Sequence, residues 1–290
     1  MGAYWFSSFM DEGEQFRFGE LIVHEDHFIR DAIGQGHLRK MNSDGFIAAP
    51  GYVMVDYAAP ISTSSSRITA CEDYIRRGCT QLLIQHPVNS IRRYRTIYHS
   101  FLAELGQLPV DYMIVPVITS SLVTPDMIRF FARERCPFIQ IELDTAVDLE
   151  EVAWEWLVQA QSLLRIPFSI VVKKEENSEY IINHLWPKKC AQYGMIKLTD
   201  PQLEERVTPQ NLRDTGIFPN KGGFKPGGYA DYNLFWQEED QIVDGQDQFI
   251  YHGAVPDITV MRGMVLQVNQ EVTANYQGKQ QKVSIYKHFV

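Results

Sequence analysis

The feature that most constrains the fold of this chain is a regular alternation between short apolar runs and longer amphipathic stretches, from Tyr52 to about Asp200. Each apolar run has the length and composition of a buried strand, and the runs recur at roughly thirty residues, the usual length of a βα unit. The runs lie at 52–58, 81–86, 111–118, 138–143, 168–173 and 194–198. This rhythm predicts an α/β region built on a parallel sheet.

The stretches between these runs carry apolar residues at helical spacing. Helices are predicted within 67–78, 90–106, 124–135 and 148–165. The third begins with Thr124, a favoured N-cap residue, followed by Pro125 at the first helical position. In the fourth, Trp154 and Trp156 are two residues apart and point in different directions, so core packing explains at least one of them, and an interface is an alternative for the other.

Both ends of the chain have the patterns of β-structure. Residues 16–51 alternate apolar and polar side chains between turn residues, and residues 256–272 and 282–290 alternate like hairpin strands. The stretch 208–237 is dense in glycine and proline. We therefore predict a small β-sandwich domain built from residues 1–50 and 215–290, with a βα domain, residues 51–214, inserted between them.

Composition and charge exclude two classes of partner. The 290 residues carry a formal net charge of -9 and a pI of about 5.4. Such a chain has no general electrostatic affinity for nucleic acid or for an anionic membrane surface. No run approaches the apolar length of a membrane span. Small solutes or protein partners are the classes that remain.

The cysteines indicate the compartment. Cys71, Cys79, Cys136 and Cys190 are scattered and form no Cys-x-x-Cys pair, so they suggest neither a zinc ribbon nor a disulfide framework. The first residues also lack the basic stretch and apolar run of a signal peptide. We expect reduced thiols and a soluble, cytoplasmic protein.

Three stretches at the two ends of the βα region carry a resemblance to a known family. They are FIAAPGYVMVDYA (46–58), NLRDTGIFPNKGGFKPGGYADYNLF (211–235) and PDITVMRGMV (256–265). Their order resembles the cyclic amidohydrolases, the dihydroorotase and hydantoinase group. The first is similar to the lead-in to barrel strand one, the second to the return from the barrel, and the third to the closing strand. In addition, QHPVNS (85–90) resembles the dihydroorotase Met-Pro-Asn segment.

The resemblance implies a TIM-like (β/α) barrel beside a small β-sandwich. Between Asp200 and Asn211 no counterpart of the seventh or eighth barrel strand is found, so we expect an incomplete or distorted barrel. An open sheet edge must be covered, because its unpaired backbone groups attract other strands. We expect a partner chain or the Pro/Gly-rich segment to cover it. The partner would be a second copy or an active homologue.

The same resemblance implies metal ligands that this chain lacks. The family places His-x-His at strand one, a carbamylated Lys at strand four and His at strands five and six, and its divalent metals lower the pKa of the attacking water. Here the corresponding residues are Asp56 and Ala58, Gln140, Ser169 and Lys197. Alanine cannot coordinate, glutamine cannot form a carbamate, and a protonated lysine repels a cation. We expect no metal cofactor. Zinc is expected only if the chain were an active hydrolase.

Three residues are candidates for residual catalysis. Asp56 ends the first predicted strand and could be a general base, or it could hydrogen-bond the backbone of a loop. His86 ends the second and could face the barrel mouth, where barrel active sites lie, or it could be satisfied by neighbouring backbone. Lys197 is the third candidate. Asn89, offered by the dihydroorotase-like segment, is a candidate for ligand binding.

Carboxylates and lysines at neighbouring strand ends suggest that ion pairs form at the barrel mouth. Glu142 and Asp144 end the fourth predicted strand and could pair with Lys173, Lys174 or Lys197. A salt-bridge network would then take the place of the metal centre, which we favour over acid/base catalysis. Glu142 and Lys173 are also candidates for binding a ligand.

These observations give two functional hypotheses and a variant. The leading one is an amidohydrolase-like protein without metal ligands that acts as a binding, scaffold or regulatory subunit. The alternative is a hydrolase of cyclic amides or related C–N bonds with a reduced or metal-free site. In the variant, a sugar, nucleobase or other small solute binds in the pocket without reacting.

Overall fold

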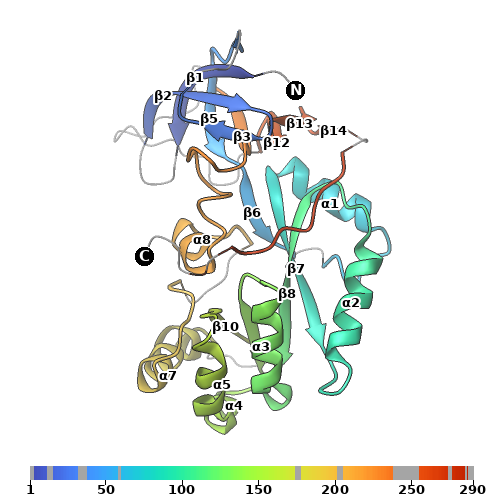
Figure 1. The fold of residues 1–290 in the computed structure, drawn as a ribbon, viewed down its shortest axis with the longest axis vertical. Coiled ribbons are helices and arrows are strands. Elements are labelled where there is room, and N and C mark those ends of the chain that lie inside the picture. The colour runs from blue at the N-terminus through green and yellow to red at the C-terminus, as the bar shows by residue number, and fades with distance from the viewer. Residues whose placement is uncertain are drawn as a thin grey trace.

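The chain folds into a parallel sheet with its helices and a second, β-rich part that lies above it in Figure 1. This computed structural model describes residues 3–11, 16–31, 38–57, 60–173, 178–200, 205–237, 255–273, 276–284 and 286. No helix in those ranges is both long and apolar enough to cross a membrane.

The parallel sheet has the strand order β10-β9-β8-β7-β6 in the described part of the chain. Its strands are β6 (Tyr52–Val55), β7 (Cys79–Val88), β8 (Asp111–Thr119), β9 (Ile139–Leu143) and β10 (Phe168–Val172). Neighbouring strands are parallel throughout, as the βα rhythm predicts. The sixth predicted strand, 194–198, is reduced to a single parallel bridge between Lys197 and Phe168. The sheet is therefore a curled half-barrel.

Helices cover one face of this sheet. They are α1 (Arg67–Arg76), α2 (Tyr94–Leu105), α3 (Pro125–Arg133), α4 (Ala146–Glu151) and α5 (Trp154–Gln161). The hydroxyl of Thr124 accepts from the backbone N–H of Met127, so the predicted cap of α3 is confirmed. The fourth predicted helix is divided into α4 and α5, because Val152 has extended backbone with φ −70° and ψ 131°.

Further helical elements lie where the periodicity predicts none. They are η1 (Ser120–Leu122), α6 (Ser178–Tyr180), η2 (Ile181–Leu185), α7 (Trp186–Tyr193) and α8 (Pro209–Thr215). Helix α7 ends at Gly194, which adopts φ 66° and ψ 32°. Glycine suits this position because the left-handed conformation carries no penalty without a Cβ.

The second sheet is built from both ends of the chain. Its strands are β1 (Tyr4–Asp11), β2 (Phe16–His24), β3 (His27–Ile29), β4 (Arg39–Lys40), β5 (Phe46–Pro50), β11 (Tyr232–Trp236), β12 (Ile258–Met261), β13 (Met264–Val268) and β14 (Glu271–Val272). β11 pairs antiparallel with β5, so the described strands form one hydrogen-bonded sheet rather than the two facing sheets of a sandwich. The limits 1–50, 51–214 and 215–290 stay a prediction.

Both edges of the half-barrel are covered by the chain itself. At the β6 edge, Val55 N–H donates to the carbonyl of Glu205 at 2.7 Å and Val207 N–H to that of Val53 at 2.9 Å. At the β10 edge, Phe168 N–H donates to the carbonyl of Ile196 at 2.9 Å. Among the described residues, this cover comes from residues just ahead of the Pro/Gly-rich segment and reaches Val53 and Val55 of β6 and Phe168 of β10.

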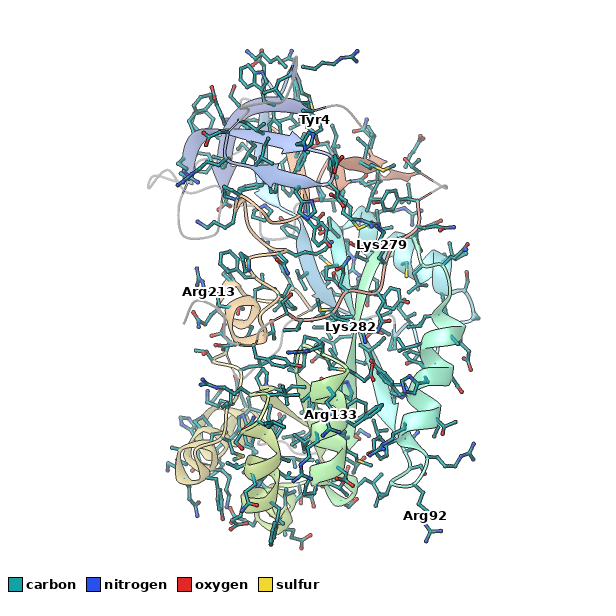
Figure 2. The ribbon with its side chains drawn as sticks, in the orientation of Figure 1. Tyr4, Arg92, Arg133, Arg213, Lys279 and Lys282 are labelled. Atoms are coloured by element: carbon teal, nitrogen blue, oxygen red, sulfur yellow. The ribbon has the colours of Figure 1, made fainter. Side chains whose placement is uncertain are left out.

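The C-terminal segment pairs with the amino end of β8. Tyr112 N–H donates to the carbonyl of Lys279 at 3.1 Å, and Gln281 N–H donates to the carbonyl of Tyr112 at 2.8 Å. Lys279 and Lys282 mark this segment in Figure 2. The hairpin strand predicted at 282–290 is not found in its described residues, and residues 285 and 287–290 lie outside them.

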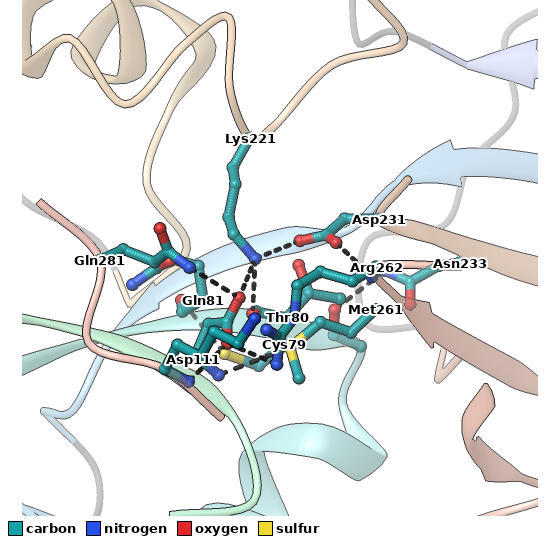
Figure 3. Close-up of polar contacts among 12 residues, drawn as sticks. Cys79, Thr80, Gln81, Asp111, Lys221, Asp231, Asn233, Met261, Arg262 and Gln281 are labelled. Atoms are coloured by element: carbon teal, nitrogen blue, oxygen red, sulfur yellow. Dashed lines mark hydrogen bonds and ion pairs between the residues drawn. The ribbon is translucent and has the colours of Figure 1, made fainter. Parts of the chain in front are cut away.

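A buried ion cluster joins the two sheets (Figure 3). The Nζ of Lys221 lies 2.8 Å from Oδ2 of Asp111 and 2.5 Å from Oδ2 of Asp231. The guanidinium of Arg262 lies 3.2 Å from Oδ1 of Asp111. Burial alone would lower the pKa of Lys221, but the two carboxylates outweigh it and raise that pKa. The lysine is therefore charged in the interior.

Removing this charge should destabilise the fold strongly. In Lys221→Met, two carboxylates lose their buried cation, and we expect the free energy of unfolding to fall by roughly 3–5 kcal/mol. Chemical denaturation measures this change. The matched control is Lys225→Met, because Lys225 is exposed in the same segment; its effect should stay within about 0.5 kcal/mol. Equal effects of the two substitutions would contradict this role of Lys221.

Candidate functional site

The candidate site is the rim formed by the carboxyl ends of the parallel strands. Ligands of open α/β sheets and barrels bind at this end because the loops after the strands converge there. Residues at or just beyond the ends of β6, β8, β9 and β10 supply its polar side chains. Their contacts decide which of them can act on a ligand.

Asp56 binds backbone groups beside the end of β6. Its side chain is 0% exposed, and its two oxygens accept the N–H groups of Ile61 at 2.9 Å and Gln85 at 2.8 Å. Burial raises the pKa of Asp56 to about 7, although both hydrogen bonds oppose the shift. These contacts agree with the backbone-binding interpretation, since the carboxylate fastens the loop after β6 to β7.

His86 lies on the helix-covered face of β7 rather than at the mouth. Its ring stacks on Phe101 of α2, with centroids 4.6 Å apart and planes at 23°, and it contacts Tyr98 edge to face at 6.0 Å. Burial lowers the pKa of His86 to about 4. The neutral ring thus packs between the sheet and α2.

Lys197 donates to backbone carbonyls close to it in the chain. Its Nζ lies 3.0 Å from the carbonyl oxygen of Leu198 and 3.4 Å from that of Thr199. Across the described residues, no hydrogen bond or ion pair joins any two of Asp56, His86 and Lys197. The structure therefore does not bring the three catalytic candidates together.

Other side chains do meet at the rim. Glu142 accepts from the hydroxyl of Thr119 at 3.3 Å and forms an ion pair with Lys173 at 2.6 Å. The hydroxyl of Tyr57 lies 3.5 Å from Oε1 of Gln140. The Glu142–Lys173 pair is one part of the predicted salt-bridge network. The Lys173 side chain is half-exposed, so solvent screens the attraction between the two charges.

Among the described residues, the side chains of Asn89 and Asp144 form no hydrogen bond or ion pair with this rim group. Asn89 is exposed beyond the end of β7, and Asp144 is exposed beyond β9. Lys174 and Ala58 lie outside the described residues. Tyr57 and Thr119 were not predicted. The period-two alternation of the parallel strands could have found Thr119, because it pairs in register with Glu142 and so shares its face.

Below the rim, polar side chains on the concave face are buried. Ser169, which pairs in register with Gln140, has no hydrogen-bond partner for its hydroxyl among the described residues, and the same holds for the amide of Gln81. Gln81 lines a cavity of about 10 Å³ together with Lys221 and Gln281. Such a cavity has room for about one water molecule, which could satisfy the amide.

The residues at the positions where the resemblance implies metal ligands are a poor donor set for a divalent cation. Both oxygens of Asp56 already accept backbone N–H groups, Gln140 is a neutral amide, and Lys197 carries a positive charge. In the ranges that the structure describes, no group of three or more His, Cys, Asp or Glu side chains could hold a metal ion. The donor set at this rim therefore suits hydrogen bonding rather than metal coordination.

Comparisons with known proteins identify the fold. No protein-family model and no curated protein matches this chain. Among solved structures it is similar to a dihydropyrimidinase from Brevibacillus agri, with 10% identity over 98% of this chain and 99% of that chain and a TM-score of 0.57. It is also similar to a D-hydantoinase (10% identity, 97% and 99%, TM-score 0.55) and to a zinc-bound atrazine chlorohydrolase from Arthrobacter aurescens (9%, 93% and 96%, TM-score 0.52). The predicted amidohydrolase-like fold is confirmed, in a truncated form.

The buried carboxyl of Asp56 should make stability depend on pH. Its pKa is about 7 in the folded protein and about 3.9 in the unfolded chain, so between these values only the folded state holds the proton. Stability contributed by this group is therefore lost as pH rises through that window. Relative to Asp56→Asn, the wild-type free energy of unfolding should fall by about 1.4 kcal/mol per pH unit between roughly pH 5 and 7.

Chemical denaturation of both proteins across this range measures the difference, with Asp73→Asn at an exposed position of α1 as the control. A difference between wild type and Asp56→Asn that stays constant from pH 5 to 8 would show that the carboxyl is not desolvated.

Proposed function

We propose that this protein is a non-catalytic binding or regulatory subunit with the fold of the cyclic amidohydrolases. The observation that carries the proposal is the state of Asp56, which stands where the resembled family has the first histidine of its metal clamp. Its two oxygens are both engaged by backbone N–H groups. A carboxylate that is 0% exposed and bound on both oxygens by backbone N–H groups fastens the loop after β6 to β7 and is shielded from solvent.

The chemistry of the other rim residues supports the same conclusion. Hydrolysis of a cyclic amide near neutral pH needs a nucleophilic water and a polarised carbonyl, which metal ions supply in the resembled enzymes. Gln140 and Ser169 are neutral, and Lys197 is bound to nearby carbonyls. None of the three reproduces the ligand that stands at its position in that family.

A hydrolase with a metal-free site is the second candidate. Its support is the pKa of Asp56, which at about 7 is close to the value that favours a general base at neutral pH. The solved structures named above, a dihydropyrimidinase, a D-hydantoinase and an atrazine chlorohydrolase, give the same candidate coarse support. Two observations argue against a metal-free hydrolase. Asp56 is 0% exposed, and His86 packs against α2 on the helix-covered face of β7.

A partner protein belongs to the leading proposal. A regulatory subunit acts through contacts, and we expect a second copy of this chain or an active homologue, in the cytoplasm. Large apolar side chains are exposed on the second sheet, including Phe18 of β2 at 63% and Trp236 of β11 at 50%. Light scattering of the purified protein, alone and mixed with an active homologue, tests for such an assembly.

Metal content and turnover test the proposed function together. Protein purified from zinc-supplemented medium and dialysed should retain far less than one zinc per chain and should not hydrolyse dihydropyrimidines or hydantoins above the buffer rate. Stoichiometric zinc that is lost in Asp56→Asn would contradict the proposal. Metal-independent turnover that Asp56→Asn abolishes would instead establish the second candidate.

A further inference from the structure

A cleft beside the rim has no role in the fold described so far. It has a volume of about 410 Å³ and lies between η1, which follows β8, and the α4–α5 pair, which follows β9. Because both loops leave the carboxyl ends of parallel strands, the cleft is on the same side of the sheet as the rim. Its size falls in the range of small-molecule sites.

Trp156 gives the cleft an aromatic wall. Its side chain lines the cleft and is 62% exposed, whereas Trp154 is 1% exposed and donates its indole N–H to the carbonyl of Leu149. The two tryptophans thus point in different directions, as the sequence predicts. The division between α4 and α5 at Val152, itself a lining residue, starts the second helix at Trp154.

The charges that line this cleft have one sign. Asp148 and Glu151 line it together with the hydroxyl-bearing Ser120 and Ser121, and no Lys or Arg is among its described lining residues. One oxygen of Asp148 accepts the N–H groups of Asp144 at 2.7 Å and Thr145 at 2.9 Å, which leaves its second oxygen for another partner. Glu151 is exposed. An anionic ligand would be repelled here.

Apolar side chains complete the lining of this cleft. Val123, Pro125 and Leu157 line the cleft beside Trp156. A ligand that fits this combination has an apolar body and a positive charge, because a cation over an indole face is attracted by the ring and two carboxylates add to that attraction. A neutral ring would gain only the apolar contact.

We infer that this cleft binds a small organic cation, an alkyl or aryl ammonium compound, with its charged group over the indole of Trp156 and facing Glu151 and Asp148. The inference rests on the proposed function and deepens it, since it places ligand binding in a cleft beside the rim instead of at the former metal positions. It assigns Trp156 and Glu151 as binding residues.

Choline and its neutral carbon isostere, 3,3-dimethylbutan-1-ol, are the probes that test this inference. The indole N–H signal of Trp156 is followed by NMR at constant ionic strength and assigned by its loss in Trp156→Phe. Choline should shift this signal saturably and leave that of Trp154 unchanged. The isostere should bind about tenfold more weakly, because it lacks the charge.

Variants localise the binding. Trp156→Ala removes an exposed side chain, so the fold should persist while the affinity for choline falls about tenfold or more. Glu151→Gln should weaken choline binding several-fold. The matched control is Glu155→Gln, since Glu155 is exposed on α5 and is not a lining residue, and its affinity should equal that of the wild type.

Other results would contradict the cation assignment, the site or the proposed function separately. Equal binding of choline and the isostere, or binding of a neutral sugar without choline, would overturn the cation assignment, and absence of any shift would overturn the site. If choline fails to bind while zinc and turnover are also absent, the cleft inference fails and the proposed function stands. If turnover is found with choline binding intact, the proposed function fails and the site stands.

Discussion

The position of one lysine between two sheets is the constraint on which the rest of this structure depends. Lys221 is 2% exposed and can be neutralised only where Asp111, at the start of β8, and Asp231, just before β11, come together. The chain passes between the sheets at Gly51, where a Cβ would lie 2.4 Å from Oγ1 of Thr80 and 3.0 Å from Cβ of Asp231. A buried charge is satisfied in few arrangements, so this cluster favours a single placement of the two sheets.

The two edges of the half-barrel are connected by a short stretch of chain. Thr199 N–H donates to Asp214 at 2.6 Å and Asp200 N–H donates to Asn211 at 3.1 Å, so α8 fixes the chain as it leaves the β10 edge. Arg206 then bridges to Met54 at the β6 edge. A short segment thus links the two edges of the sheet. The loops after β8 and β9, at the carboxyl ends of the strands, form the cleft beside the rim.

The sequence predicts this fold well where a local pattern is sufficient and poorly where distant residues decide. The βα rhythm, the Thr124 cap and the β-structure at both ends follow from periodicity and turn chemistry. The face on which His86 lies could not be predicted, because the run QLLIQH is buried on both sides of the sheet and carries no alternation. The Lys221 cluster could not be found either, since Asp111 is 110 residues away in the chain. Only folding brings Lys221 and Asp111 together.

The charges at the rim and in the neighbouring cleft differ in a way that bears on function. At the rim Glu142 is paired with Lys173, and burial raises the pKa of Asp56, which lowers the charge that this carboxyl carries near neutral pH. In the cleft, no Lys or Arg is among the described residues that line it with Asp148 and Glu151. The rim therefore carries little net charge near neutral pH, while the two carboxylates beside the exposed indole of Trp156 create a field that attracts cations. Electrostatics therefore favours a cationic ligand in the cleft formed by the loops after β8 and β9 over the rim.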